Sequence, residues 1–261
     1  MTSFTELMNL RDRRAMITGG AGHIGRVMAQ TLAELGADVI LVDRPGTDWT
    51  AARASISSHA RVETVECDLE SAEDRERLVA STESLTILVN NAAFVGTSGL
   101  AGWSTAFELQ QVDTWRRALE VNLTAVFDLV KGFTPTLRKS EGASIINVSS
   151  LYGQYGPDYR LYEGTEMGNP AAYAASKGGL LQLTRWLATT LAPDIRVNAI
   201  SPGGVWRDQP ASFVSRYEAR TPLARMAVED DFRGCIGFLA SNLSAYVTGQ
   251  NIAVDGGWGV W

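Results

Sequence analysis

Two residues four apart in the sequence, Tyr173 and Lys177, have side chains that together can move a proton. Residues at this spacing share one face of a helix, so the phenol and the ammonium would lie close together. A free tyrosine has a pKa of about 10, which makes it a poor base at neutral pH. A nearby ammonium stabilises the phenolate, and a shift to neutrality takes about three units, or about 4 kcal/mol. We therefore expect Tyr173 to exchange a proton with a substrate oxygen, with Lys177 as one source of its lower pKa.

Ser150 is a third candidate for the same chemistry. It closely follows the apolar run 144–148, which predicts a buried strand, whereas Tyr173 and Lys177 fall in a helix predicted over 171–191. Ligands in open α/β sheets bind outside the carboxyl ends of the strands. A serine at such an end can hydrogen-bond the reacting oxygen and orient it.

A glycine-rich segment, residues 18–25, joins the first predicted strand to the first predicted helix. Glycines let the backbone turn sharply and approach a pyrophosphate, and the helix N-terminus offers free N–H groups to the anion. Asp43 follows the second predicted strand, where an acid can accept both adenosine ribose hydroxyls and repel a 2′-phosphate. The sequence therefore predicts NAD as the cofactor, with NADP less favoured, although the adjacent Arg44 could turn toward a phosphate.

Short apolar runs alternate with segments of helical periodicity along the chain. The runs predict strands at residues 15–18, 39–42, 61–66, 85–89, 144–148, 195–200 and 252–254. The main helices between them are predicted at about 24–35, 113–131, 171–191 and 229–241, with another beginning near Ser71. Such alternation implies right-handed crossovers, and wholly apolar strands imply helices on both faces. We therefore predict an α/β fold: a single-domain, doubly wound, Rossmann-like parallel sheet of about seven strands over residues 1–261, with substrate loops at about 94–111, 151–170 and 203–223.

The composition narrows the classes of partner. The chain has 261 residues and a net charge of −6, which argues against nucleic acid or an anionic membrane and favours a small-molecule substrate. Two distant cysteines, Cys67 and Cys235, form no disulfide framework, and no Cys/His cluster has metal-ligand spacing, so no metal is predicted. The first 14 residues lack the apolar segment of a signal peptide, and no long apolar run predicts a membrane span. We expect a cytoplasmic protein.

These motifs resemble the short-chain dehydrogenase/reductase family over nearly the whole chain. The glycine loop has the form T-G-x-x-x-G-x-G, and Tyr173 and Lys177 form Y-x-x-x-K. Further matches are Asn90-Asn91-Ala92-Ala93, Ser201-Pro202-Gly203, Thr248-Gly249-Gln250 and Asp255-Gly256-Gly257. A narrower similarity, at residues 22–25 and 161–165 and at the Trp-rich end, is to bacterial members linked to flagellin or lipopolysaccharide sugar modification. The family implies hydride transfer between a nicotinamide and a carbonyl or secondary alcohol, by a homotetramer or homodimer.

The resemblance also implies residue roles. The catalytic residues would be Asn122, Ser150, Tyr173 and Lys177, with Ser150 preferred as the later serine of its pair. Asn122 would support a proton path through water to the lysine, Asp68 would contact the adenine, and Asn90 would partly tie the central strands together. The cofactor-binding residues would be Gly19, Gly22, His23, Ile24, Gly25, Asp43, Asp68, Leu69, Asn90, Ala92, Tyr173, Lys177, Pro202, Gly203 and Val205.

The chain departs from the family pattern in places that bear on specificity. His23 stands where a glycine is usual, Arg207 stands where a threonine is frequent, and the segment between Ser150 and Tyr173 is longer than usual. A sugar or nucleotide-sugar substrate would suit the aromatic and polar residues of the loops. The candidate neighbours are Trp103, Tyr155, Tyr159, Trp206 and Arg207, each of which could equally serve in loop packing.

Two other functions are possible on the same scaffold: a non-redox enzyme such as a dehydratase or dehalogenase, and a non-catalytic NAD sensor. The retained glycine loop, Asp43 and Lys177 argue against the first, and the presence of both Tyr173 and Lys177 argues against the second. At the C-terminus, Trp258 and Trp261 are expected to be exposed and to pack against another subunit.

Overall fold

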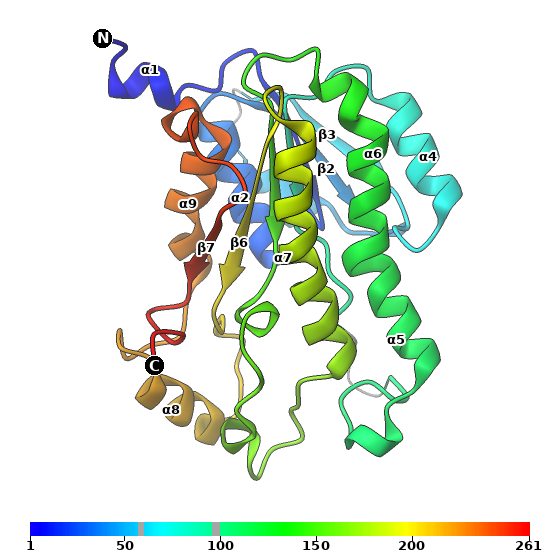
Figure 1. The fold of residues 1–261 in the computed structure, drawn as a ribbon, viewed down its shortest axis with the longest axis vertical. Coiled ribbons are helices and arrows are strands. Elements are labelled where there is room, and N and C mark those ends of the chain that lie inside the picture. The colour runs from blue at the N-terminus through cyan, green and yellow to red at the C-terminus, as the bar shows by residue number, and fades with distance from the viewer. Residues whose placement is uncertain (57–59, 96–99) are drawn as a thin grey trace.

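The computed structural model describes residues 1–56, 60–95 and 100–261, which form one seven-stranded sheet in the order β3-β2-β1-β4-β5-β6-β7 (Figure 1). The strands are β1 (Arg14–Thr18), β2 (Asp38–Asp43), β3 (Val62–Glu66), β4 (Ile87–Asn90), β5 (Ser144–Val148), β6 (Arg196–Pro202) and β7 (Asn251–Val254). All neighbouring strands pair in parallel. The strand order reverses at β1, so the crevice between the ends of β1 and β4 is where a ligand is expected.

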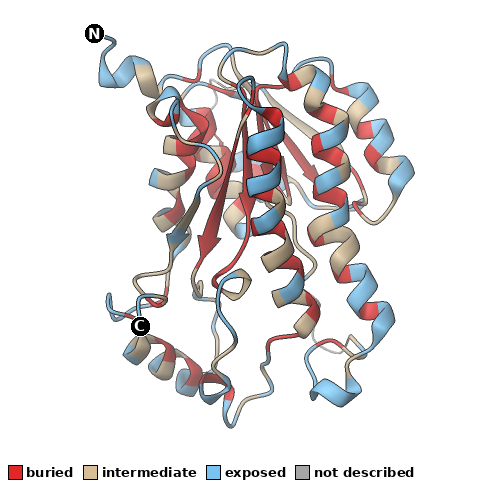
Figure 2. Cartoon of the chain, viewed as in Figure 1, coloured by how far each residue is buried: buried red, intermediate tan, exposed pale blue. Residues whose placement is uncertain are grey.

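Helices cover both faces of the sheet. On one face, α2 (His23–Glu34), α3 (Thr50–Ala54) and α9 (Arg233–Ala240) share a core with the strands. On the other face lie α4 (Ala72–Ser81), α6 (Ala125–Leu137) and α7 (Ala171–Leu191). Buried residues run along the central strands and the inward sides of these helices (Figure 2). The predicted doubly wound, Rossmann-like sheet is confirmed.

One predicted helix has a different form. The segment 113–131 belongs to α5 (Val112–Leu119), a π-helical turn (Glu120–Thr124) and α6, which continues to Leu137. Pro135 lies inside α6, near its end. The π turn has no signature in apolar periodicity, because one extra residue per turn shifts the pattern only locally. The prediction therefore found the helix but missed its interruption and its last turns.

The segments that break the strand–helix alternation gather beyond the carboxyl ends of the strands. The segment 151–170 forms two short 3-10 turns (Leu151–Gly153 and Tyr159–Tyr162), and 203–223 contains α8 (Ala211–Arg220). These two segments pack together through Leu151, Leu161, Tyr162, Phe213 and Tyr217. Residues 96–99 of the predicted loop 94–111 lie outside the described part of the chain.

Trp258 corrects an expectation about the C-terminus. Its side chain is 1% exposed within its own chain and packs in the same cluster as Phe213 and Tyr217. Arg220 of α8 covers its ring, with the guanidinium carbon 4.2 Å from the ring centroid. Trp261, in contrast, is 71% exposed. Of the two tryptophans, Trp261 is therefore the one available to pack against another subunit.

The remaining helix, α1 (Phe4–Met8), lies near the amino ends of the strands (Figure 1). Within the described residues, none of the helices has the length and apolar character needed to span a membrane.

Candidate active site

The glycine loop leads from β1 into α2 with little room for side chains. Gly19 has φ +65°, and a Cβ added to Gly25 would lie 2.1 Å from the carbonyl oxygen of Gly19. Gly22 is the N-cap residue of α2 and provides no side-chain cap, so it leaves the first N–H groups of the helix without a side-chain acceptor from this position. A close-packed glycine turn at an uncapped helix N-terminus fits the diphosphate of a dinucleotide. Gly19, Gly22, Ile24 and Gly25 thus lie together at the predicted cofactor edge.

Asp43 ends β2 beside this loop. Its Oδ2 accepts a hydrogen bond from the N–H of Ala21 at 3.1 Å, and its Oδ1 accepts one from the N–H of Arg44 at 2.9 Å. The carboxylate is half-buried and held in place by the backbone, with lone pairs left for further donors. Such a fixed carboxylate fits the two hydroxyls of a ribose.

Asp68 and Leu69 follow the neighbouring strand, β3. Oδ1 of Asp68 accepts from the N–H of Glu70 at 3.0 Å, and Leu69 is buried in the core. Both residues therefore lie along the same edge as Asp43, next to the end of β2.

Asn90 and Asn91 have different tasks. The amide of Asn90 is buried and donates to Oδ1 of Asn147 at 2.8 Å, which ties β4 to β5. Asn91 donates from Nδ2 to the carbonyls of Thr18 at 3.0 Å and Gly19 at 3.2 Å, and so fixes the glycine loop. The role of Asn91 was not predicted from the sequence, although the Asn90-Asn91 doublet is visible there as a motif. The N–H of Ala92 also donates to Oγ1 of Thr18 at 3.1 Å.

Ser150 and Tyr173 meet at the end of β5. Ser150 caps the 3-10 turn that follows the strand, with its Oγ accepting from the N–H of Tyr152 at 3.2 Å. Tyr173 lies in the first turn of α7 and is partly exposed. Burial of the hydroxyl raises the pKa of Tyr173 above its ordinary value, and a hydrogen bond with Ser150 opposes that rise. The two hydroxyls therefore form one site.

Lys177 lies one turn further along α7 and is fully enclosed. Its Nζ donates to the carbonyl oxygen of Val148 at 2.8 Å and lies 5.8 Å from the ring centroid of Tyr173. Burial lowers the pKa of Lys177 to about 8. The expected lowering of the Tyr173 pKa is not found, because burial of the phenol outweighs the hydrogen bond with Ser150. Lys177 is thus placed beside the phenol, and burial makes its ammonium form less favoured than that of a free lysine.

Asn122 lies in the π turn between α5 and α6 and is buried. Its Oδ1 accepts from the N–H of Phe94 at 2.6 Å, and its Nδ2 donates to Oγ of Ser176 at 3.0 Å. Ser176 directly precedes Lys177, so Asn122 contacts α7 beside the lysine. The π turn directs this amide inward, next to the active-site helix.

The end of β6 leads along the same edge of the sheet. Pro202 is the last residue of the strand, and Gly203 and Val205 come shortly after it. A Cβ added to Gly203 would lie 2.8 Å from Cα of Asp255, which explains a glycine there. Val205 forms an isolated parallel bridge with Ala227. These contacts hold the segment after β6 close to the end of β7.

His23 and Arg207, the two unusual residues, both approach Glu229. His23 is the first residue of α2, with its side chain 60% exposed and its Nδ1 3.6 Å from Oε1 of Glu229. Arg207 places Nη2 2.9 Å from the same oxygen. The structure therefore brings these residues together at the glycine loop, with a carboxylate between them that the sequence analysis did not single out.

The loop 151–170 places polar groups near Ser150. The hydroxyls of Tyr152 and Tyr162 contact each other, and burial raises the pKa of both tyrosines. Asn169 is buried beside the hydroxyl of Tyr152, and its amide oxygen and nitrogen make no well-aligned hydrogen bond among the described residues. An amide of this kind is suited to bind a polar group of a ligand.

The candidate substrate neighbours predicted from sequence have mixed environments. Trp103 is buried against Phe94 and donates its indole N–H to the carbonyl of Val95 at 2.6 Å, so it belongs to the core. Tyr155 packs against Trp258, while Tyr159 and Trp206 are exposed.

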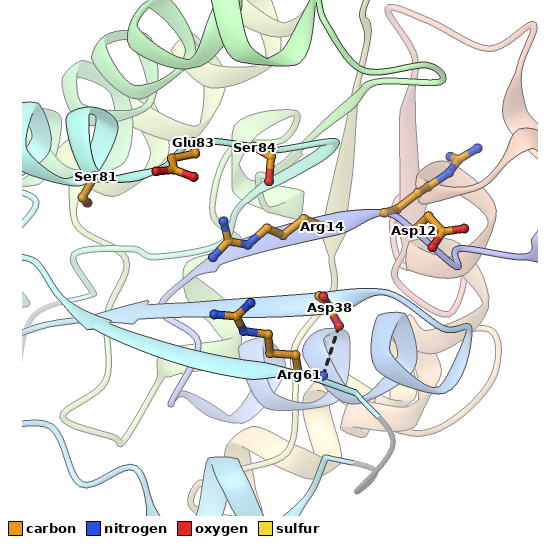
Figure 3. Close-up of a pocket in the computed structure, with 8 residues that line it drawn as sticks. Asp12, Arg14, Asp38, Arg61, Ser81, Glu83 and Ser84 are labelled. Atoms are coloured by element: carbon orange, nitrogen blue, oxygen red, sulfur yellow. Dashed lines mark hydrogen bonds between the residues drawn. The ribbon is translucent and has the colours of Figure 1, made fainter.

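A separate hollow of about 390 Å³ lies at the opposite edge of the sheet (Figure 3). Two of the side chains that line it are Arg14, from β1, and Arg61, from the segment before β3 (Figure 3). Arg14 pairs with Glu63, and the backbone N–H of Arg61 donates to Asp38 at 3.1 Å. This hollow lies at the amino ends of the strands, so it is not part of the candidate active site.

Comparisons with known proteins agree with the fold. Residues 19–259 match a family model described as enoyl-(acyl carrier protein) reductase. A protein of Rhizobium meliloti named "Probable galactose dehydrogenase GalD" is 32% identical, over 97% of each chain.

Two solved structures are also similar. A protein of Beutenbergia cavernae described as a "putative NAD(P) dependent gluconate 5-dehydrogenase", with bound NADP at low occupancy, has a TM-score of 0.84 and 31% identity over 98% of this chain and 100% of that one. A short-chain dehydrogenase of Leptospira borgpetersenii with bound NAD+ has a TM-score of 0.81 and 31% identity over 99% and 96%. The chain belongs to the short-chain dehydrogenase/reductase family. It is an NAD(P)-dependent oxidoreductase that acts on a small-molecule substrate.

Proposed function

We propose that the chain transfers hydride between NAD(H) and a secondary alcohol or carbonyl of a sugar or sugar acid, within one catalytic domain over residues 1–261. The observation that carries this proposal is the meeting of Ser150, Tyr173 and Lys177 at the end of β5, on the same edge of the sheet as the glycine loop. A bound nicotinamide supplies the hydride chemistry. The glycine loop and this catalytic group give no support to a non-redox enzyme or an NAD sensor.

Each catalytic side chain has one task in this proposal. In the oxidation direction, the substrate hydroxyl gives its proton to Oη of Tyr173 as its carbon loses hydride. Ser150 donates a hydrogen bond to the substrate oxygen and holds it against Tyr173. Lys177 stabilises the tyrosinate, and Asn122 holds the surrounding part of α7 through Ser176.

The preference for NAD rests on Asp43. Its backbone-held carboxylate would receive the ribose hydroxyls, whereas a 2′-phosphate would place negative charge against it. The similar structures include one with NAD+ and three with NADP, so the proposed preference for NAD depends on residues of this chain. The other proposed cofactor contacts, from Gly19 to Val205, surround the same crevice.

The sugar class rests on two lines of support. Similar proteins are named for galactose and gluconate. Near Ser150, the hydroxyls of Tyr152 and Tyr162 and the amide of Asn169 would receive substrate hydroxyls. The narrower link to flagellin or lipopolysaccharide sugars stays a prediction, as does the cytoplasmic location.

A substrate panel tests the proposed function. Purified protein would be mixed with NAD+ or NADP+ and with sugars, sugar acids, nucleotide sugars or simple secondary alcohols, while absorbance at the nicotinamide band is followed. We expect faster reduction of NAD+ than of NADP+, and highest turnover with a polyhydroxylated substrate. Binding of neither cofactor would contradict the reaction class, and turnover only with apolar alcohols would contradict the sugar class.

We also propose assembly into a homotetramer or homodimer. Large apolar side chains are exposed on three helices of the described structure: Trp115 on α5, Phe127 on α6 and Trp186 on α7. Covering them against a second copy would remove apolar surface from water. Light scattering should give a multiple of the 28.2 kDa chain mass, and a monomer at micromolar concentration would contradict this proposal.

A further inference from the structure

His23, Arg207 and Glu229 are distant in sequence but lie together at the start of α2. The carboxylate of Glu229 contacts the side chains of the other two residues. Oε1 of Glu229 lies 2.9 Å from Nη2 of Arg207 and 3.6 Å from Nδ1 of His23. His23 also lies 3.4 Å from Nη2 of Arg26. Glu229 thus sits among cationic or potentially cationic side chains at the start of α2.

The place of this cluster matters because α2 begins there. The helix N-terminus carries partial positive charge and unpaired N–H groups, which attract an anion. Gly22 offers no side-chain cap to these groups. A carboxylate fixed nearby competes electrostatically with any diphosphate that binds them.

Glu229 is held in position by its own element. It begins the 3-10 turn Glu229–Phe232, and Phe232 is buried in the same core cluster as Met28 of α2. The neighbouring charges of this region are paired elsewhere: Asp231 with Arg225, and Arg233 with Glu34 and Asp230. These pairs leave Glu229 as the acid that faces His23 and Arg207.

Arg207 does not depend on Glu229 alone for its position. Its backbone N–H donates to Oε1 of Gln209 at 2.7 Å, and its Nη1 donates to the carbonyl of Trp206 at 2.6 Å. Removing the Glu229 charge would therefore leave the guanidinium near the glycine loop and free to meet an anion.

We propose that Glu229 is a competing carboxylate that weakens cofactor binding. In the free protein it pairs with Arg207 and His23. These pairs must break before the two side chains can contact the diphosphate of the cofactor. This inference rests on the proposed function, because it takes the anion to be that of NAD(H). The carboxylate remains close to the bound diphosphate and repels it, which speeds cofactor release. Arg207 in turn attracts the diphosphate through its guanidinium charge.

The test measures binding of NADH rather than turnover. Fluorescence titration gives Kd and stopped-flow displacement gives the dissociation rate for wild type and Glu229→Gln. We expect Glu229→Gln to bind NADH about three- to tenfold more tightly and to release it more slowly, since partly exposed charges have limited effects. Asp230→Asn is the matched control, because it removes the same charge from the next, exposed residue, and it should leave Kd unchanged.

A double-variant cycle identifies the partner. Arg207→Ala should weaken NADH binding, and Glu229→Gln should have a smaller effect in the Arg207→Ala background than in wild type. Unchanged or weaker binding by Glu229→Gln, or an equal gain in Asp230→Asn, would overturn the inference. If wild type binds and uses NADH normally, such a result leaves the proposed function standing; if wild type binds no nicotinamide cofactor, the proposed function itself fails.

Discussion

At Tyr173, two environmental effects act on one phenol. Burial raises its pKa, whereas the hydrogen bond with Ser150 favours the phenolate. The spacing of Tyr173 and Lys177 predicted that the two would share a helix face, and they do. The pattern could not predict that Lys177 would be enclosed, with its own pKa lowered to about 8, because enclosure depends on Val148 and the fold around it. In the proposed mechanism, a positive charge on the bound nicotinamide would add to Lys177 in favouring the phenolate form of Tyr173.

The buried Lys177 predicts a pH-dependent stability difference. Its pKa is about 8 in the folded protein and about 10.5 when unfolded, so between these values the unfolded state binds more protons and stability rises with pH. Relative to Lys177→Met, wild type should gain on the order of 3 kcal/mol of unfolding free energy from pH 7.5 to pH 10.5. Urea unfolding of the cofactor-free proteins measures this. A difference between the two proteins that does not change with pH would show that Lys177 titrates normally.

At the scale of elements, apolar runs predicted the strands well because both faces of this sheet are covered. The glycine loop was also predictable, because the spacing of its glycines is set by a sharp backbone turn within a short segment. The π turn at Glu120–Thr124 and the role of Asn91 were not, because each depends on contacts between elements. The contacts of Glu229 could not be predicted for the same reason, because its partners His23 and Arg207 come from distant segments of the chain.

Gly25 tests the connection between β1 and α2. In Gly25→Ala, the new methyl group would overlap the carbonyl of Gly19, so the loop must shift. We expect at least a tenfold loss of NADH affinity, or about 1.4 kcal/mol, together with a lower unfolding free energy. Gly234→Ala in α9 is the matched control, since no atom lies within 4 Å of the added Cβ. It should leave affinity unchanged and not lower stability. Equal NADH affinity in both variants would contradict close packing of the loop.

At the scale of the whole molecule, the end of the chain after β7 packs against the segments 151–170 and 203–223. Trp258 lies between Tyr217 of α8 and Tyr155 of the segment 151–170, and it is buried within its own chain. Sequence alone could not place it, because a tryptophan near a chain end suits an interface as well as a core. Its burial implies that the last residues are part of the folded unit.

Trp258→Ala should therefore destabilise the chain. Removing a buried tryptophan costs about 3–5 kcal/mol in typical cores, so a drop of this order in unfolding free energy is expected. Trp261→Ala removes a largely exposed ring and should cost less than about 1 kcal/mol. Denaturant unfolding of both variants provides the comparison. Equal stability of the two would contradict the position of Trp258.

The most direct measurement for the catalytic account is NADH binding and turnover by Tyr173→Phe, once a substrate is found. The variant keeps the ring but lacks the hydroxyl that exchanges the proton. We predict NADH affinity within about twofold of wild type and a fall in kcat of at least about a hundredfold, as is usual for loss of a general acid–base group. Turnover at the wild-type rate would contradict the assignment of proton transfer to Tyr173.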